Sequence, residues 1–215
     1  MRKFVLMAFS IVLIGQFCFA ADTLVLEKAK ELISRQQYDL AIAILQNYIP
    51  ENPNYAEGYL LMAQAYHWKK ELYKSKAFYT QAAALNNQYR LAIIPLLDEL
   101  KEWKEIIDIV EPEMRTGKKL DPSALGALAT SYRQLEQKKK ADEIVEKLSG
   151  TTYADQDDED YKNYILAYAR LWDGDKDGAK AKLKLIKNRA YRQYARTHEK
   201  FSVLFQDPEF LELTR

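Results

Sequence analysis

The sharpest chemical motif in the sequence is an acidic run in which Asp173, Asp175 and Asp177 stand at alternate positions and Gly178 follows. Carboxylates at this spacing open calcium-binding loops, which also need a bidentate glutamate at the twelfth position. Lys184 stands at that position, so a cation replaces the second chelating carboxylate. Aspartate and glycine are also ordinary turn residues. We therefore expect a turn between two helices and no metal site, with a weak calcium site at these three aspartates as the alternative.

Other residues with catalytic chemistry are sparse. His67 and His198 lie far apart in the sequence, and the single cysteine, Cys18, lies near the N-terminus. The sequence has no Gly-rich phosphate loop, no HExxH zinc motif and no nucleophile elbow centred on serine. Because no catalytic constellation is present, the sequence predicts a protein that is not an enzyme and uses no cofactor.

The residues between Ala29 and Asn87 repeat with a period of 34 residues. Small residues at Ala29 and Ala41 are matched by Ala63 and Ser75, and large residues mostly keep their places. The spacing inside each copy is helical, and small residues let paired helices approach closely. A period of this length with two helices in each unit is typical of a helical solenoid.

This pattern resembles the tetratricopeptide repeat (TPR) family, whose order of small, large and proline positions matches Ala29-Leu32, Ala41-Leu45 and Pro53. The resemblance implies an all-α, right-handed α-α superhelix of about five helix pairs with a C-terminal capping helix. We expect one continuous solenoid domain over residues 21–215. The predicted repeats are residues 22–55, 56–89, 90–117, 122–149 and 160–187, and the predicted cap is residues 190–215.

Repeats three and five depart from the pattern. In repeat three, the apolar spacing predicts a turn about three residues shorter than in the neighbouring repeats, and Pro112 is expected to bend or end the second helix. In repeat five, Ala167 and Ala179 take the small positions, but Arg170 stands where a large apolar residue is expected, so a register one residue away is the alternative. Between repeats four and five, the polar stretch over residues 149–160 predicts a solvated loop.

The resemblance implies that the first helix of each repeat lines a concave groove for a partner. The repeat-five aromatics at spacings of 3, 4 and 4 are suitable anchors for a peptide segment. The same spacing also describes a buried helical face, and both interpretations stay open. The groove lacks the Lys/Asn/Arg pattern with which TPR proteins clamp a terminal carboxylate. The predicted partner-binding residues are Leu60, Gln64, His67, Trp68, Asp98, Lys101, Arg133, Gln134, Tyr161, Tyr164, Tyr168 and Trp172.

The N-terminus has the three parts of a Sec-type signal peptide. Arg2 and Lys3 precede an apolar run over residues 4–14, and small residues at Cys18 and Ala20 precede a cleavage point. An uncleaved membrane anchor, or acylation at Cys18 as a lipoprotein, is the alternative. We expect residues 1–20 to be removed near Ala20, which predicts a periplasmic or exported protein with no membrane span after cleavage.

Charge and composition narrow the function further. The 32 Lys and Arg residues balance 31 Asp and Glu residues, so the sequence lacks the basic surface that nucleic-acid binding needs. The chain is 48% hydrophobic with only seven glycines and six prolines, which allows a sizeable core. Because the only cysteine lies in the predicted signal, the mature protein is expected to have no disulfide.

These features together predict a non-catalytic periplasmic TPR scaffold or adaptor that binds a peptide segment or a partner protein of the cell envelope in its concave groove. The expected role is to support assembly of secretion, pilus, outer-membrane or polysaccharide machinery, and fold alone does not choose among these. Two alternatives are a glycan-binding or cell-wall-associated envelope protein that uses the repeat-five aromatics, and a calcium-modulated interaction module.

Overall fold

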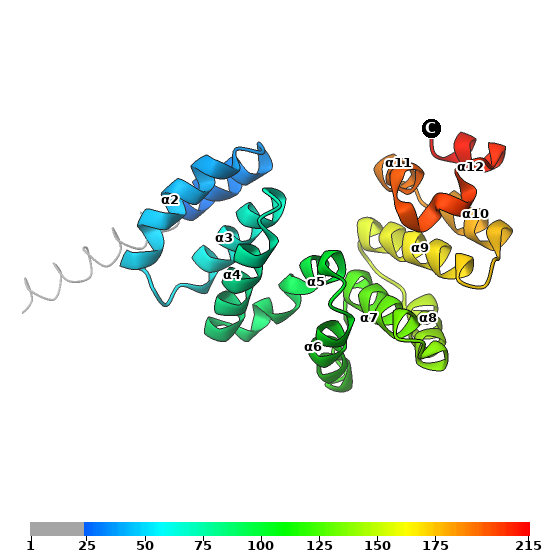
Figure 1. Ribbon diagram of the computed structural model, residues 1–215, viewed down its shortest axis with the longest axis horizontal. Coiled ribbons are helices and arrows are strands. Elements are labelled where there is room, and N and C mark those ends of the chain that lie inside the picture. Colours follow the sequence, from blue (N-terminus) through cyan, green and yellow to red (C-terminus); the bar gives the residue numbers. More distant parts are fainter. Residues whose placement is uncertain (1–23) are drawn as a thin grey trace, which may run out of the picture. The chain divides into compact units, whose positions relative to one another are not determined.

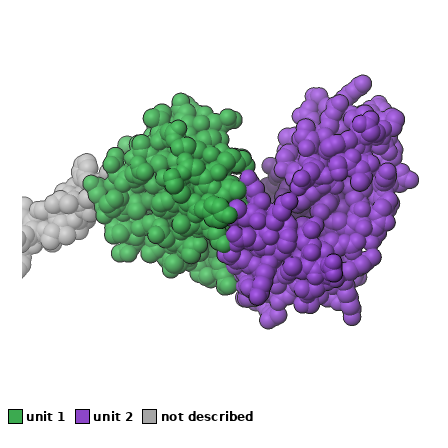
Figure 2. Space-filling view, in the orientation of Figure 1, with its two compact units in different colours: residues 1–96 green, residues 97–215 purple. Residues whose placement is uncertain are grey.

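The structure is a computed structural model that describes residues 24–215. The predicted signal peptide lies outside these described residues. Within them the regular elements are helices, and none of these helices is long and apolar enough to cross a membrane. The chain divides into two compact units, residues 1–96 (unit 1) and residues 97–215 (unit 2), which Figure 2 shows in different colours. Each unit is described by itself below.

The helices follow one another in pairs along the chain (Figure 1). The first two pairs are residues 24–34 with α2 (Tyr38–Glu51), and α3 (Ala56–Trp68) with α4 (Leu72–Leu85). The 3-10 segment η1 (Asn87–Ile93) leads into α5 (Ile94–Leu100), within which the unit boundary falls, and α5 is followed by α6 (Trp103–Arg115). The last two pairs are α7 (Pro122–Gln134) with α8 (Lys138–Gly150), and α9 (Gln156–Leu171) with α10 (Lys176–Lys184). The chain then forms α11 (Arg189–Thr197), the 3-10 segment η2 (Glu199–Leu204) and α12 (Pro208–Leu213).

One turn geometry joins the two helices of each of these pairs. A residue just after the first helix adopts the left-handed backbone conformation, with φ between 59° and 79°. The next residue donates its N–H to the carbonyl of the residue five positions earlier, at 2.8–3.0 Å. This is the Schellman motif, which satisfies carbonyl groups left open at a helix C-terminus. The left-handed residues are Gln36, Lys70, Lys101, Glu136 and Gly174, and the accepting carbonyls belong to Leu32, Tyr66, Leu97, Tyr132 and Arg170.

The common turn corrects the geometry predicted for repeat three. Its turn has the same hydrogen bonds as the others, so the expectation of a shorter turn is wrong. Leu97 follows Tyr66 by 31 residues instead of 34, and the shortening lies before α5, where the chain passes directly from η1 into the helix. Pro112 lies inside α6, which continues to Arg115, so this proline does not end the helix. In repeat five the same turn places Arg170 at the position where a large apolar residue was expected.

Small residues occupy the places where the paired helices approach most closely. Ser75 shows how close the approach is, because its hydroxyl donates a hydrogen bond to the Ala63 carbonyl of the facing helix at 2.8 Å. Larger side chains at these places hold two helices further apart. Repeat three carries Ile94 and Ile106 at these places. In the other repeats the small residues have no exposed surface, and they are Ala29, Ala41, Ala63, Ser75, Ala129, Ala141, Ala167 and Ala179.

The C-terminal segment covers the last helix pair within unit 2. In Figure 1, α11, η2 and α12 lie beside α9 and α10, which they contact. Phe201 and Phe210 have no exposed surface. Lys180 of α10 forms ion pairs with Asp207 and Glu209 at the start of α12, at 3.0 and 2.8 Å. The predicted C-terminal cap and the predicted all-α fold of helix pairs are therefore confirmed.

The acidic stretch before α9 is not the solvated loop that its composition predicted. Asp155 caps α9 by accepting hydrogen bonds from two N–H groups of the helix's first turn. The helix therefore already includes residues 156–160 of the acidic run over residues 155–160. Asp160 has no exposed surface. Its two carboxylate oxygens accept main-chain N–H bonds from Lys187 at 3.0 Å and Asn188 at 2.6 Å, and Gln156 donates to it at 2.9 Å. A buried charge that is fully hydrogen-bonded in this way ties the start of α9 to the chain after α10.

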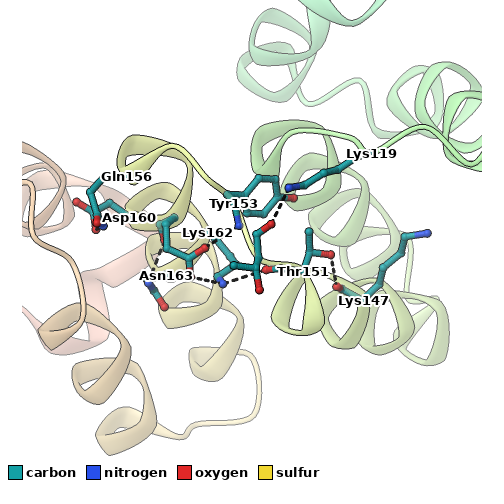
Figure 3. A network of polar contacts seen from close by, with 10 residues as sticks. Lys119, Lys147, Thr151, Tyr153, Gln156, Asp160, Lys162 and Asn163 are labelled. Atoms are coloured by element: carbon teal, nitrogen blue, oxygen red, sulfur yellow. Dashed lines mark hydrogen bonds and ion pairs between the residues drawn. The ribbon is translucent and has the colours of Figure 1, made fainter.

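The connection between repeats four and five is held by its own polar network (Figure 3). The Tyr153 side chain is buried, and its hydroxyl donates to the Leu120 carbonyl at 3.0 Å. The Lys119 ammonium lies over the Tyr153 ring, 4.5 Å from its centroid. Lys162 of α9 donates to the Thr151 carbonyl at 3.0 Å. The connection is therefore held both by the segment before α7 and by α9, although it makes the spacing between repeats four and five longer.

Candidate functional site

Three of the four aromatic residues predicted in repeat five lie on α9 against the C-terminal segment of unit 2, and the fourth, Trp172, directly follows α9. Tyr164 is 5% exposed, and its ring lies 5.2 Å from the Phe201 ring, measured between centroids. Tyr161 stacks on Tyr164 at 5.8 Å. Tyr161, Tyr168 and Trp172 are only partly buried. Tyr164 therefore belongs to the core, and the remaining three residues keep some surface for a partner.

Charged residues from three other elements surround the Tyr168 end of this stripe. Lys200 of η2 lies over the Tyr168 ring, 5.1 Å from its centroid, and pairs with Asp98 of α5 at 3.2 Å. Arg133 of α7 lies over the Trp172 ring at 5.7 Å and donates to the Trp172 carbonyl at 2.8 Å. Each ring is therefore attracted electrostatically to the cation that lies over it. We call this group the α9 site, and it consists of Asp98, Arg133, Tyr164, Tyr168, Trp172 and Lys200.

Three buried polar atoms of the α9 site have no hydrogen-bond partner within the described residues. They are Asp98 Oδ1, Tyr164 Oη and Trp172 Nε1. Burial raises the pKa of Tyr164, so its hydroxyl stays protonated and able to donate. A buried polar atom left without a partner costs about 1–3 kcal/mol, and most such atoms in proteins are satisfied. The site therefore offers two donors and one acceptor to an incoming polar group.

The other predicted binding residues lie outside the α9 site. Lys101 is exposed at the turn after α5, and Gln134 is exposed at the end of α7. Trp68 is 59% exposed at the end of α3, and its ring stacks with that of His67 at 6.0 Å. The predicted residues on α3 belong to unit 1, and they are Leu60, Gln64, His67 and Trp68.

Comparisons with known proteins identify the fold. No family model matches the chain, and no curated protein matches it. Among solved structures, the chain is similar to the crystal structure of nearly identical TPR-like repeats of a putative kinesin light chain from Podosopora anserina. The TM-score is 0.57 at 13% identity, over 81% of this chain and 96% of that chain. The chain has a TPR-like fold. At this identity the likeness shows the fold alone.

In this TPR-like fold the predicted calcium motif forms the turn of the fifth helix pair and the start of α10. Asp173 pairs with Lys138 at 2.8 Å, and this hydrogen bond lowers the pKa of Asp173. Asp175 caps α10 by accepting a main-chain N–H of its first turn at 2.8 Å, and Asp177 pairs with Lys180 at 3.2 Å. Each carboxylate thus has its own partner. The described residues contain no group of three His, Cys, Asp or Glu side chains placed to hold a metal ion.

Two residues at or beside the α9 site, Lys200 and His198, were not predicted from the sequence because they lie in the tail after the last repeat. A sequence signal exists for His198. Tyr191, Tyr194, His198 and Phe201 follow one another at spacings of 3, 4 and 3, which is the spacing of a helical face, although α11 itself ends at Thr197. That face matches the aromatic stripe of the TPR-like repeat on α9, and two matching aromatic faces favour packing against each other.

Acidification is expected to destabilise the protein through His198. Burial, and then the nearby Lys200, lowers the pKa of His198, while Glu199 and Asp98 oppose this. The unfolded chain therefore takes up a proton at higher pH than the folded chain. This contribution to stability is complete above about pH 6.5 and is lost as the pH falls towards the folded pKa.

The variant His198→Asn keeps a side-chain acceptor for the Lys200 N–H but does not titrate. Its melting temperature should fall less than that of the unchanged protein between about pH 7.5 and about pH 5.5. Thermal melts of both proteins at the two pH values check this. An equal fall in both proteins would show that His198 does not contribute.

Proposed function

We propose that this protein is a non-catalytic scaffold that binds an extended peptide segment of a partner protein at the α9 site. The TPR-like fold supports a protein partner, since such folds generally act as interaction scaffolds. The observation that carries the proposal is the set of three buried polar atoms of the α9 site that have no hydrogen-bond partner among the described residues.

The main chain of a peptide matches these atoms chemically. A peptide carbonyl accepts a hydrogen bond from Trp172 Nε1–H or from the Tyr164 hydroxyl, and a peptide N–H donates to Asp98 Oδ1. The partly buried Tyr168 ring supplies apolar contact for a peptide side chain. Because the three atoms are buried, binding requires the side chains that cover them to move aside.

We propose further that the protein acts in the periplasm after cleavage near Ala20, where it supports assembly of an envelope complex such as secretion, pilus, outer-membrane or polysaccharide machinery. The pattern of residues 1–20 supports the location. The full-length protein would be expressed in a Gram-negative host and recovered from the periplasmic fraction. Ala21 is expected as its first residue, and a protein that still begins at Met1 would contradict export with cleavage.

Selection from a random peptide display library tests binding at the α9 site. Peptides that bind the protein would be titrated against Tyr164→Phe and Trp172→Phe, which remove Tyr164 Oη and Trp172 Nε1. Each variant should weaken peptide binding about five- to tenfold, because one hydrogen bond to a buried atom contributes about 1 kcal/mol. Fluorescence anisotropy of the labelled peptide measures the affinity.

Stability measurements separate binding from a structural role. Since Tyr164 Oη has no partner within the described chain, Tyr164→Phe should leave the free energy of unfolding unchanged or raise it. Tyr73→Phe is the matched control, because Tyr73 on α4 is 78% exposed. It should change neither the peptide affinity nor the free energy of unfolding. If no peptide is selected, or if the α9 variants bind selected peptides as tightly as the unchanged protein does, the proposed site is wrong.

A further inference from the structure

One pair of positions changes character in the last helix pair. Each helix pair has two corresponding positions. The first is the residue of the first helix whose carbonyl accepts the hydrogen bond of the turn, and the second is the residue of the second helix twelve positions later in the sequence. In the second pair these two residues stack, with ring centroids 5.5 Å apart. In the fifth pair the two residues are Arg170 and Lys182. In the first four pairs they are apolar: Leu32 with Ile44, Tyr66 with Phe78, Leu97 with Ile109, and Tyr132 with Ile144.

A cavity of about 350 Å³ lies at this changed position, between α8, α9 and α10 of unit 2. Its apolar lining is formed by Val145, Leu166 and Ala169. Arg170 does not fill it, because its side chain is 57% exposed and its guanidinium lies 3.7 Å from the Asp175 carboxylate. The volume lies at the lower end of the range for ligand pockets, about 300–1,000 Å³. The loss of the apolar pair thus leaves a space of ligand size.

The wall that α8 contributes to this cavity is acidic. Asp142 and Glu146 stand one helical turn apart, and neither forms an ion pair with another described residue. Like charges at this spacing repel each other, so a cation placed between them is favoured. From α10, Lys182 also lines the cavity, and it too has no ion pair in the part of the chain that the structure describes. The Trp172 side chain lines the same cavity.

We propose that this cavity binds an arginine side chain of a partner polypeptide. The aliphatic stem of arginine packs along the apolar lining, as such stems do on apolar surfaces. Its guanidinium carries five N–H donors, which suit the paired carboxylates of Asp142 and Glu146. The Lys182 ammonium, which lines the same cavity, provides a donor for the main-chain carbonyl of the same arginine. The inference shares with the proposed function the polypeptide partner and one residue, Trp172, which belongs to the α9 site and also lines this cavity.

Titration with Nα-acetyl-arginine amide, followed in ¹H–¹⁵N NMR spectra of the protein, tests this inference. Saturable shifts are expected for the amide signals of Val145 and Ala169. Nα-acetyl-citrulline amide has nearly the same shape without the charge, and it should bind at least tenfold more weakly because the charge-assisted hydrogen bonds are lost. Equal binding of the two compounds, or shifts that map away from the cavity, would overturn the proposal.

Two double variants make the test specific. Asp142→Asn with Glu146→Gln changes exposed side chains, and it should weaken binding of the arginine compound at least tenfold. Arg170→Leu with Lys182→Ile rebuilds the apolar pair of the other repeats, and it should abolish binding without lowering the melting temperature. Tyr164→Phe should leave binding of the arginine compound unchanged, which separates this result from the proposed function. Unchanged affinity in both double variants would place the arginine elsewhere.

Discussion

Replacing Phe201 with alanine is expected to lower the free energy of unfolding by about 3–5 kcal/mol. Phe201 has no exposed surface, and its ring contacts those of Tyr164, Tyr168 and Phe210 at 5.2–6.3 Å between centroids. The truncation removes the apolar side chain and leaves a cavity between α9 and the C-terminal segment. Denaturation in urea, followed by circular dichroism, measures the change.

Val203→Ala is the matched control for this prediction, because Val203 lies in the same 3-10 segment but is 57% exposed. It should change the free energy of unfolding by about 0.5 kcal/mol or less. If Phe201→Ala were no more destabilising than Val203→Ala, the C-terminal segment would not pack against α9 as the structure shows. Peptide binding at the α9 site should weaken in Phe201→Ala, since the Tyr164 and Tyr168 rings lose their support.

Asp160→Ala is expected to lower the free energy of unfolding by about 3 kcal/mol. The substitution leaves the partly buried N–H groups of Lys187 and Asn188 without this acceptor, and an unsatisfied buried group costs about 1–3 kcal/mol. The free energy of unfolding of Asp160→Asn should lie between those of Asp160→Ala and the unchanged protein, because an amide offers one acceptor oxygen where the carboxylate offers two. The same denaturation measurement applies.

Asp108→Ala on α6 is the control for the aspartate series, because Asp108 is exposed. Asp108→Ala should change the free energy of unfolding by about 0.5 kcal/mol or less. Hydrogen exchange adds a local test, since the Lys187 and Asn188 amides should lose protection in Asp160→Ala. Protection equal to that of the unchanged protein would show that Asp160 does not hold these amides.

The sequence was most informative where the structure repeats. Small residues such as Ala63 and Ser75 mark close helix approaches because only small side chains fit there, so their spacing revealed both the helix pairs and their register. The five turns gave no comparable signal. Four of them use a residue with a side chain, such as Gln36 or Lys70, in a conformation where glycine is the usual marker.

The features that sequence analysis missed depend on contacts between distant segments. Asp160 belongs to a run of acidic residues that is typical of a solvated loop, but its partners are main-chain groups 27 and 28 residues later. Composition carries no information about such an acceptor. The aromatic stripe on α9 stayed ambiguous for a related reason, since the residues that cover Tyr164 lie in a tail that does not follow the repeat.

The four turn residues Gln36, Lys70, Lys101 and Glu136 have a consequence for engineering. Each is exposed and holds a left-handed conformation that costs an ordinary residue about 1–2 kcal/mol compared with a right-handed one, whereas glycine avoids most of this cost. Replacing any one of these four surface residues with glycine relieves this strain, and it should therefore raise the free energy of unfolding without altering the core. The turns of this solenoid are therefore the first places to change when a more heat-resistant form is needed as a scaffold for designed binding surfaces.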